Sequence, residues 1–298
     1  MKIFLDNVNV ESSSGPNSFG RKLISSLREK GNEFVSANEA DISLCFIESK
    51  HHELSIPRVQ RLDGIYFNNE QDYVSQNAGI KRTYDSSDGV IFQSEFNRKL
   101  ITKYFGEHKK HIVIHNGADL NAISAAPVLK AAEKYNDVWV CASSWRPHKR
   151  LKDNIRYFLE YKKENDVLFV AGDVRDSEMV MEPNIYYIGK IEQQHLYSLY
   201  KSSKYFIHLA WLDHCPNVVV DARACGAKII CSDSGGTKEI AGLDAIVIQE
   251  REVWDLEPIR LYDPPKMDFN NKVENNLESD VDMAAVSRKY ENFMKEFV

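Results

Sequence analysis

The sequence lacks the features of a membrane-spanning or disulfide-bonded protein. No segment approaches the roughly 18–20 consecutive apolar residues that a transmembrane helix needs. The five cysteines are an odd number and contain no Cys-x-x-Cys pair, so reduced thiols in a cytoplasmic protein are the simplest interpretation. The first residues, Lys2 to Asp6, predict a β-strand instead of the apolar core of a signal peptide. We therefore expect a cytoplasmic protein without a transmembrane segment, and peripheral contact with a membrane stays compatible with the sequence.

The composition and the missing motifs also exclude several functions. The 38 basic residues are outnumbered by 44 acidic ones, so no excess of positive charge indicates nucleic acid as a partner. No Gly-x-x-x-x-Gly-Lys-Ser/Thr loop occurs, which argues against a P-loop ATPase. No Gly-x-Ser-x-Gly turn occurs either, so a hydrolase triad would have no nucleophile.

Two patterns resemble metal sites but have simpler explanations. Asp280-Val-Asp282 matches a D-x-D metal motif, yet it lies at the start of a predicted final helix, where N-capping explains it better. His108, His111 and His115 flank a predicted strand without the carboxylates that would support a zinc site. We therefore predict no bound metal.

Predicted strands and helices alternate along most of the chain. The strands are continuous apolar runs, as expected where helices cover both faces of a sheet. The alternation implies an α/β protein with parallel sheets and right-handed crossovers. In the first half we expect strands at 2–6, 41–47, 57–62, 89–92 and 111–115 and helices near 17–30, 69–86 and 95–105. In the second half we expect strands at 137–141, 166–171, 185–188, 205–209, 228–231 and 244–248 and helices near 150–164, 192–202 and 217–225.

The length of 298 residues suits two domains of about 100–150 residues each. A hinge is expected between Asn116 and Leu129, so we assign residues 1–123 to a first Rossmann-like domain and residues 124–280 to a second. Residues 250–279 are polar and rich in turn formers, and we expect them to be mostly irregular. An apolar stripe in residues 281–298 predicts a final amphipathic helix. This helix either packs in the adjacent core or, more specifically, crosses back to the first domain.

Two carboxylates, Asp213 and Asp221, lie eight positions apart around the start of a predicted helix. Pro216 suits the first turn of that helix, because proline has no N–H to lose there and its φ is already helical. The N-terminus of the helix offers unpaired N–H groups and a partial positive charge, which favour a phosphate. Carboxylates on either side can hold sugar hydroxyls. This arrangement indicates a nucleotide-sugar site, whereas the simpler alternative is that both acids only cap or solvate the helix.

Several motifs of the sequence occur in the same order as in a known protein family. The chain resembles family 4 glycosyltransferases, the retaining, nucleotide-sugar-dependent enzymes with the two-domain GT-B fold, and the resemblance is strongest from about residue 137 to 241. It implies two Rossmann-like domains whose parallel sheets face a central cleft, with the acceptor on the first and the nucleotide sugar on the second. The motifs are Ser94, Val113-Ile-His-Asn-Gly-Ala-Asp119, Trp145-Arg-Pro-His-Lys-Arg150, Tyr187-Ile-Gly-Lys190, the 213–226 segment, and Ser234-Gly-Gly-Thr-Lys-Glu239.

The resemblance assigns separate roles to the two acids. In the family, the first acid of a Glu-x7-Glu pair holds hydroxyls of the donor sugar and the second binds the ribose. Asp213 and Asp221 occupy these positions here, each one methylene shorter than glutamate. Between them, the backbone N–H groups of Asn217 and Val218 would face the diphosphate.

A cationic site is expected in the loop after the strand at 137–141. The family places an Arg and a Lys there to neutralise the leaving diphosphate. Lys149 matches the motif, but Ser144 stands where the family has its Arg, so Arg146 is a substitute by proximity and Arg150 is a competitor. Cations at the N-terminus of a helix oppose its dipole, which indicates an anion nearby.

Further candidates follow from the remaining motifs. Gly189 and Lys190 belong to the motif that the family uses on the donor side. Gly15 allows close backbone approach to a donor phosphate, although a plain turn explains it equally well. Asp63 and Arg61 end a strand where many family members place a sugar-contacting histidine, and either can equally be a simple turn residue.

These observations predict a metal-independent, retaining hexosyltransferase without a cofactor. Its donor would be a UDP- or GDP-linked sugar, its acceptor a hydroxyl of a glycan or small molecule, and its role glycan or polysaccharide synthesis. Two alternatives stay open: a catalytically weakened GT-B protein that only binds nucleotide or glycan, and a GT-B-fold sugar-nucleotide epimerase. The epimerase would need more acid–base residues than the sequence offers. A periplasmic-type binding protein shares two α/β lobes, but we found no signal peptide for it.

Overall fold

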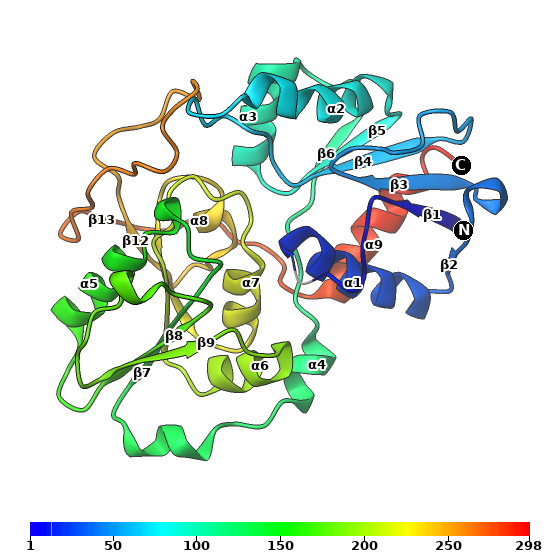
Figure 1. Cartoon of the computed structure of the whole chain (residues 1–298). Helices are drawn as coiled ribbons and strands as arrows, with labels where there is room; N and C mark the ends of the chain where they lie inside the picture. Colours follow the sequence, from blue (N-terminus) through cyan, green and yellow to red (C-terminus); the bar gives the residue numbers. More distant parts are fainter. Residues whose placement is uncertain (13) are drawn as a thin grey trace. The chain divides into compact units, whose positions relative to one another are not determined.

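The computed structural model describes residues 1–12 and 14–298, which form two compact units (Figure 1). Unit 1 consists of Met1–Gly117, Asp255–Ile259 and Asp280–Val298, and unit 2 consists of Ala118–Trp254 and Arg260–Ser279. The chain thus leaves unit 1 somewhat earlier than the expected boundary at residue 123. It also returns to unit 1 for a short segment, Asp255–Ile259, which the sequence did not indicate. Ser13, in the loop expected to lie near a donor phosphate, is outside the described residues.

Unit 1 is organised around a parallel sheet with the strand order β2-β1-β3-β4-β5-β6. The strands are β1 (Lys2–Asp6), β2 (Glu33–Phe34), β3 (Ile42–Phe46), β4 (Arg58–Leu62), β5 (Gly89–Phe92) and β6 (His111–Val113). All residues of β3, β4 and β5 are buried. Burial on both faces explains why β3 and β5 are mostly apolar without alternation. Strand β4 is the exception, because Arg58, Gln60 and Arg61 are buried in it.

Helices cover both faces of this sheet: α2 (Tyr73–Ser86) and α3 (Glu95–Phe105) on one, α1 (Gly15–Glu29) and α9 (Met283–Met294) on the other (Figure 1). Capping residues in the sequence determine where these helices begin. Asp72 and Ser94 cap α2 and α3 by accepting hydrogen bonds from the N–H groups of Ser75 and Asn97. Asp282 caps α9 in the same way, and Asp280 pairs with Lys289 at 2.8 Å. The D-x-D pattern is therefore used as a helix start, as expected.

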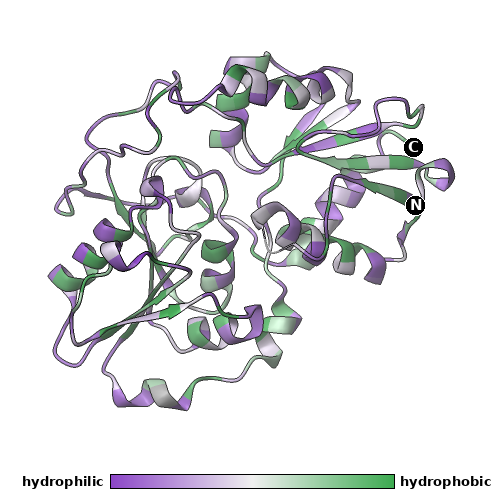
Figure 2. Cartoon of the chain, in the orientation of Figure 1, coloured by the Kyte–Doolittle hydropathy of each residue, from purple (hydrophilic) through white to green (hydrophobic). Residues whose placement is uncertain are grey.

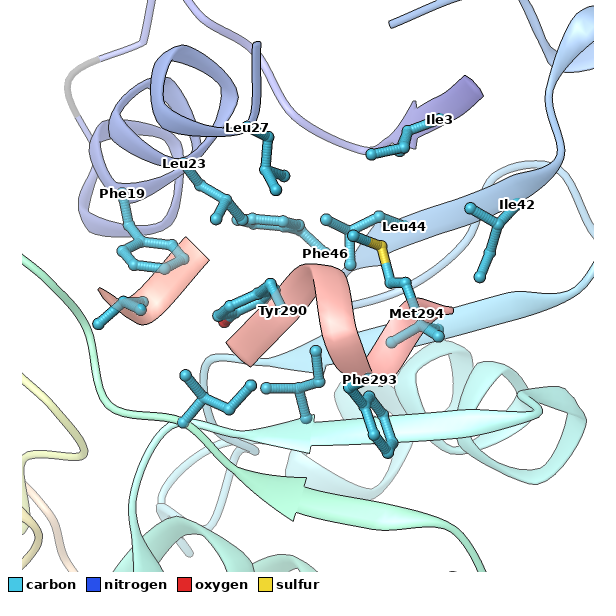
Figure 3. Packing of buried hydrophobic residues seen from close by; sticks show 14 of the residues in the cluster. Ile3, Phe19, Leu23, Leu27, Ile42, Leu44, Phe46, Tyr290, Phe293 and Met294 are labelled. Atoms are coloured by element: carbon cyan, nitrogen blue, oxygen red, sulfur yellow. The ribbon is translucent and has the colours of Figure 1, made fainter. Parts of the chain in front are cut away.

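The final helix completes the core of unit 1. Tyr290, Phe293 and Met294 of α9 pack among side chains of α1, β1 and β3 (Figure 3). A buried hydrogen bond of 2.8 Å between Ser26 and Ser287 joins α1 to α9. Residues 280–298 therefore belong structurally to the first unit, although they come last in the sequence. Both chain termini lie in this unit (Figure 1).

Unit 2 contains a second sheet with the order β13-β12-β11-β10-β7-β8-β9. Its strands are β7 (Val138–Ala142), β8 (Val167–Ala171), β9 (Ile185–Gly189), β10 (Tyr205–His208), β11 (Lys228–Ser232), β12 (Ile246–Ile248) and β13 (Lys272–Val273). All pairings are parallel except that of β13, which is antiparallel to β12. Strand β13 lies in the polar stretch expected to be irregular. Figure 2 shows that apolar residues concentrate in the strands and that hydrophilic residues lie on the outer helix faces.

The helices of unit 2 are α4 (Leu120–Ala125), α5 (Leu151–Tyr161), α6 (Gln193–Lys201), α7 (Asn217–Ala224) and α8 (Thr237–Ile240). Helix α4 occupies the start of the stretch expected to be a hinge. Because β7 and β10 are parallel neighbours, the loops that follow them leave the sheet at the same edge. This edge places the β7–α5 loop next to the β10–α7 loop. Among residues 1–12 and 14–298, no helix combines the length and apolar character needed to cross a bilayer.

Candidate donor-binding site in unit 2

The β7–α5 loop presents a short basic segment. Pro147–Lys149 form a single 3₁₀ turn, and Arg150 then adopts a left-handed conformation with φ of 52° before α5 begins. His148 is buried and its ring stacks on Tyr262 at 5.6 Å between centroids. Burial, reinforced by the positive charge of Lys149, lowers the pKa of His148 to about 3, so this imidazole is neutral at physiological pH. Arg146 is exposed.

The β10–α7 loop brings Asp213 back against the end of its own strand. Leu212 adopts φ of 57°, and its N–H donates to the Ser234 hydroxyl at 3.3 Å. The carbonyl of Asp213 accepts from the N–H of Gly236 at 2.7 Å. A Cβ on Gly235, whose φ is 74°, would lie 2.4 Å from that carbonyl oxygen. The Ser-Gly-Gly motif therefore holds the backbone that carries Asp213.

Lys149 and Asp213 meet across the two loops. The Lys149 Nζ lies 2.5 Å from Asp213 Oδ2, and the exposed fractions of the two side chains are 18% and 13%. His208, the last residue of β10, approaches the same oxygen with its Nε2 at 2.9 Å. Burial alone would raise the pKa of Asp213, but Lys149 and His208 outweigh it and hold the pKa well below its usual value. We expected Lys149 on an exposed loop, whereas it is largely covered and paired with this carboxylate.

The second acid lies inside α7. Asp221 is buried, and its Oδ2 accepts from Gln193 Nε2 at 3.3 Å. The same Gln193 nitrogen donates to the Tyr197 hydroxyl at 2.7 Å. The first amides of α7 that bond within the helix are those of Val219 and Val220, which both donate to the Pro216 carbonyl. The amides of residues 217 and 218 precede them, at the positive end of the helix dipole.

The structure thus brings together three segments that the sequence singled out separately: the basic loop, Asp213, and the N-terminus of α7 with Asp221. The structure places the guanidinium of Arg150, the competing cation of the basic loop, away from these segments. Arg150 is buried and donates to Glu250 at 2.5 and 3.1 Å and to the Pro265 carbonyl at 2.9 Å. Its guanidinium therefore ties the loop to the segment around residues 250–265, and it does not join Lys149 at Asp213.

Gly189 ends β9 with φ of 63°, a backbone conformation that favours glycine. The Gly172 N–H donates to its carbonyl at 2.8 Å, and the exposed Lys190 follows. These residues lie at the far edge of the same sheet as Asp213, with β8 and β7 between β9 and β10.

The candidates of unit 1 have a different environment. Arg61 is fully buried between the rings of Phe19 and Phe46, whose centroids lie 4.3 and 4.8 Å from its guanidinium carbon. It forms an ion pair with Asp63 and donates to the Tyr290 hydroxyl. Burial raises the pKa of Asp63 more than the charge of Arg61 lowers it.

Two further facts bear on the unit 1 candidates. Arg61 also donates to Asn116 Oδ1 at 2.7 Å, so its position depends on β4, β6 and α9 together. Asp63 keeps a buried oxygen, Oδ2, that has no hydrogen-bond partner among the described residues. Gly15 is the first residue of α1 and is exposed.

Two residues of the site were not singled out in the sequence. His208 is the end of an apolar strand, where a histidine is more often a core residue, and only its position five residues before Asp213 could have indicated a role. Nothing in the sequence indicates Gln193, because its contact with Asp221 depends on how α6 packs on α7. Gly235 belongs to a motif that the sequence did single out, although its contact with the Asp213 backbone was not foreseen. Within the described part of the chain, no group of three or more His, Cys, Asp or Glu side chains could hold a metal ion.

Residues 136–257 match the family model described as "Glycosyl transferases group 1". No curated protein sequence matches the chain.

Solved structures of glycosyltransferases share its fold. HepE from Anabaena in complex with UDP-glucose has a TM-score of 0.72 at 12% identity, covering 99% of this chain and 100% of HepE. Sucrose-phosphate synthase from Thermosynechococcus elongatus has a TM-score of 0.72 at 10% identity, covering 99% and 98%. WaaG, a glycosyltransferase involved in lipopolysaccharide biosynthesis, has a TM-score of 0.63 at 12% identity, covering 100% and 96%.

The protein therefore has the GT-B fold, with two Rossmann-like α/β units. The stretch of its second unit that matches the group 1 glycosyltransferase model, residues 136–257, spans the loops of Lys149 and Asp213 and the helix of Asp221. The predicted resemblance to family 4 glycosyltransferases is confirmed at this level.

Proposed function

We propose that this protein is a retaining, metal-independent glycosyltransferase that moves a hexose-type sugar from a nucleoside-diphosphate donor to a hydroxyl acceptor. The observation that carries the proposal is the meeting of Lys149 with Asp213 beside the N-terminus of α7. A cation, a sugar-binding carboxylate and the first amides of a helix are the groups that such a donor needs. They come from loops that are 64 residues apart in sequence.

In this proposal each part of the donor has its own partner in unit 2. The diphosphate binds the amides of Asn217 and Val218, and Gly189 and Lys190 contact another part of the donor from the end of β9. Asp221 binds the ribose hydroxyls, and Asp213 binds hydroxyls of the transferred sugar. A UDP-linked sugar is our first choice of donor because HepE, which shares the fold, was solved with UDP-glucose, and a GDP-linked sugar is the second.

The chemistry needs no protein base. The bond between the anomeric carbon and the diphosphate oxygen breaks, and Lys149 and Arg146 stabilise the negative charge that develops on the leaving group. The acceptor hydroxyl attacks from the same face, and its proton passes to the departing phosphate. Acceptor recognition is placed on unit 1, where Asp63 keeps one carboxylate oxygen without a partner among the described residues. A role in glycan or polysaccharide synthesis follows from an acceptor of this kind.

Incubation of the protein with a panel of UDP-, GDP- and ADP-sugars tests the proposal. Slow release of free nucleoside diphosphate from one donor, even without acceptor, is the expected result, and product analysis then reports the anomeric configuration. Donor binding without turnover would instead support a weakened GT-B protein. Conversion of the sugar without release of diphosphate would support an epimerase.

A further inference from the structure

His208 is a buried histidine for which the reaction described above has no use. It is the last residue of β10, and its side chain is only 4% exposed. Five residues later Asp213 returns to it, because the intervening loop is fixed from both sides. The Trp211 N–H donates to the His148 carbonyl at 2.7 Å, and the Asp213 carbonyl accepts from Gly236. The contact between the His208 ring and the Asp213 carboxylate is therefore set by the backbone.

The two oxygens of Asp213 are used unequally. Oδ2 lies within hydrogen-bond distance of both Lys149 Nζ and His208 Nε2, at 2.5 and 2.9 Å. Oδ1 accepts from the backbone N–H of His214 at 3.0 Å. A carboxylate oxygen can accept more than one hydrogen bond, so Oδ1 keeps the capacity to accept one from a hydroxyl. The carboxylate is thus held by one of its oxygens while the other can still take a ligand.

The direction of the His208 hydrogen bond follows from chemistry. Asp213 stays ionised because its pKa is held well below the usual value, and an ionised carboxylate can only accept. Burial lowers the pKa of His208 against the opposing influence of Asp213, so the imidazole is neutral at physiological pH. His208 must therefore carry its proton on Nε2. It is a neutral donor that adds no positive charge beside Lys149.

We propose that His208 is a positioning residue for the donor sugar: it fixes the Asp213 carboxylate so that Oδ1 meets the sugar hydroxyls and Lys149 can turn to the diphosphate. Without His208, Lys149 would be the only side chain among the described residues that holds Oδ2. When the ammonium turned to the leaving diphosphate, the carboxylate would lose its fixed orientation toward the sugar. The inference rests on the proposed function, since it assigns His208 to the sugar end of that donor site. It also explains how a side chain one methylene shorter than glutamate keeps a defined orientation.

Two substitutions of His208 separate positioning from packing. His208→Leu removes the donor and keeps an apolar side chain in the core, whereas His208→Gln retains an N–H near the place of Nε2. Ile207→Val is the matched control, because Ile207 is buried on the same strand and, as the residue next to His208, points to the opposite face of the sheet. For His208→Leu we expect kcat to fall about tenfold, the effect of losing one hydrogen bond to a charged group. We expect most of that loss to be recovered in His208→Gln, and kcat to stay near wild type in Ile207→Val.

The dissociation constant for UDP alone should stay unchanged in all three variants, because UDP lacks the sugar that Asp213 holds. A wild-type kcat in His208→Leu would overturn the inference. So would a His208→Gln protein as slow as His208→Leu, or a parallel loss of UDP affinity, since each indicates a structural role.

A substrate-free measurement distinguishes this inference from the proposed function. In ¹⁵N NMR spectra of the histidine rings, His208 should show a protonated Nε2 whose shift changes in Asp213→Asn. If that signature is absent while the wild-type protein transfers sugar, only the role of His208 fails. If it is present but the wild-type protein consumes no nucleotide sugar, the proposed function fails, and the role of His208 fails with it.

Discussion

Each unit pairs a cation with an aspartate close to the end of a strand, yet the two pairs differ in how completely the protein surrounds the cation. In unit 1, the exposed fraction of the Arg61 side chain is 0%, and that of Asp63 is 16%. In unit 2, the corresponding values are 18% for Lys149 and 13% for Asp213. Arg61 is enclosed by two aromatic rings and bonded to Tyr290 and three further side chains. In the described part of the chain, the Lys149 ammonium is paired with one carboxylate, that of Asp213.

The difference indicates which of the two cations can bind a ligand. The planar guanidinium of Arg61 is bonded around its edge and covered on its faces, so a ligand could reach it only by breaking native contacts. Lys149 has a flexible stem, partial exposure and one strong partner, so it can exchange that partner for a diphosphate. We therefore propose that Arg61 holds unit 1 together and that Lys149 acts in the reaction. The predictions below test this division.

The largest effect is expected for Arg61→Met. The substitution leaves Asp63 buried without its counter-ion and removes the link to Tyr290 of α9, and breaking a buried pair in this way typically costs about 3–5 kcal/mol. Circular dichroism should show a lower denaturation midpoint. Trp139, Trp145, Trp211 and Trp254 all lie in unit 2, so their fluorescence reports that unit separately and should change less. Arg82→Met, at an exposed position, is the control. Equal stability of both variants would show that Arg61 does not hold the unit.

The next effect is expected for Lys149→Ala. Turnover should fall by roughly two orders of magnitude, because a charge directed at the leaving group acts mainly in the transition state. The protein should remain folded, since His208 and the His214 amide still donate to Asp213. The exposed Lys152→Ala variant in α5 provides a matched control with wild-type kinetics. If Lys149→Ala kept full activity, Arg146 and not Lys149 would be the residue that stabilises the leaving group.

A smaller effect is expected for Asp221→Ala. UDP and the intact donor should both bind more weakly, by roughly ten- to a hundredfold, because the ribose loses a charge-assisted hydrogen bond. Isothermal titration with each ligand measures this, and the exposed Asp244→Ala is the control. If UDP binding is unchanged, the buried Asp221 serves only its contacts with Gln193 and the neighbouring tyrosines.

No effect is expected from removal of metal ions. In the proposed mechanism, Lys149, Arg146 and the N-terminus of α7 neutralise the diphosphate, so turnover in the presence of EDTA should equal that without it. Loss of activity with EDTA, followed by recovery with Mn²⁺ or Mg²⁺, would contradict the assignment. Asp282 is an unsuitable metal ligand in that case too, because it caps α9.

The sequence predicted the strands and helices well where one local cause decides them. Most of the buried strands are apolar runs, with β4 as the exception, and the helix starts at Asp72, Ser94 and Asp282 carry capping side chains. Strand β13 could not be predicted, because two residues become a strand only by pairing with β12. The return of Asp255–Ile259 to unit 1 likewise depends on tertiary contacts, such as the hydrogen bond from the Ile259 N–H to the Phe67 carbonyl.

The candidate site was predictable as a set of segments but not as a set of contacts. Motif order identified the loops of Lys149 and Asp213, and parallel strands explain why the loops are adjacent. The strand order alone could not show that Arg150 pairs with Glu250 while Lys149 pairs with Asp213. The two cations are adjacent on one loop, and the backbone conformation decides where each side chain points. The left-handed φ of Arg150 separates them. His208 was missed for a similar reason, since its role depends on a loop that folds back.

The central claim is that Lys149 acts on the diphosphate and Asp213 on the sugar, although the two are paired in the free protein. Titration of UDP into the Lys149→Ala and Asp213→Ala proteins tests it most directly. We predict that Lys149→Ala weakens UDP binding by about tenfold or more, while Asp213→Ala stays within about twofold of wild type or binds more tightly, because Lys149 loses a competing anion. Equal weakening by both substitutions would contradict the account, since the pair would then only support the loops around it.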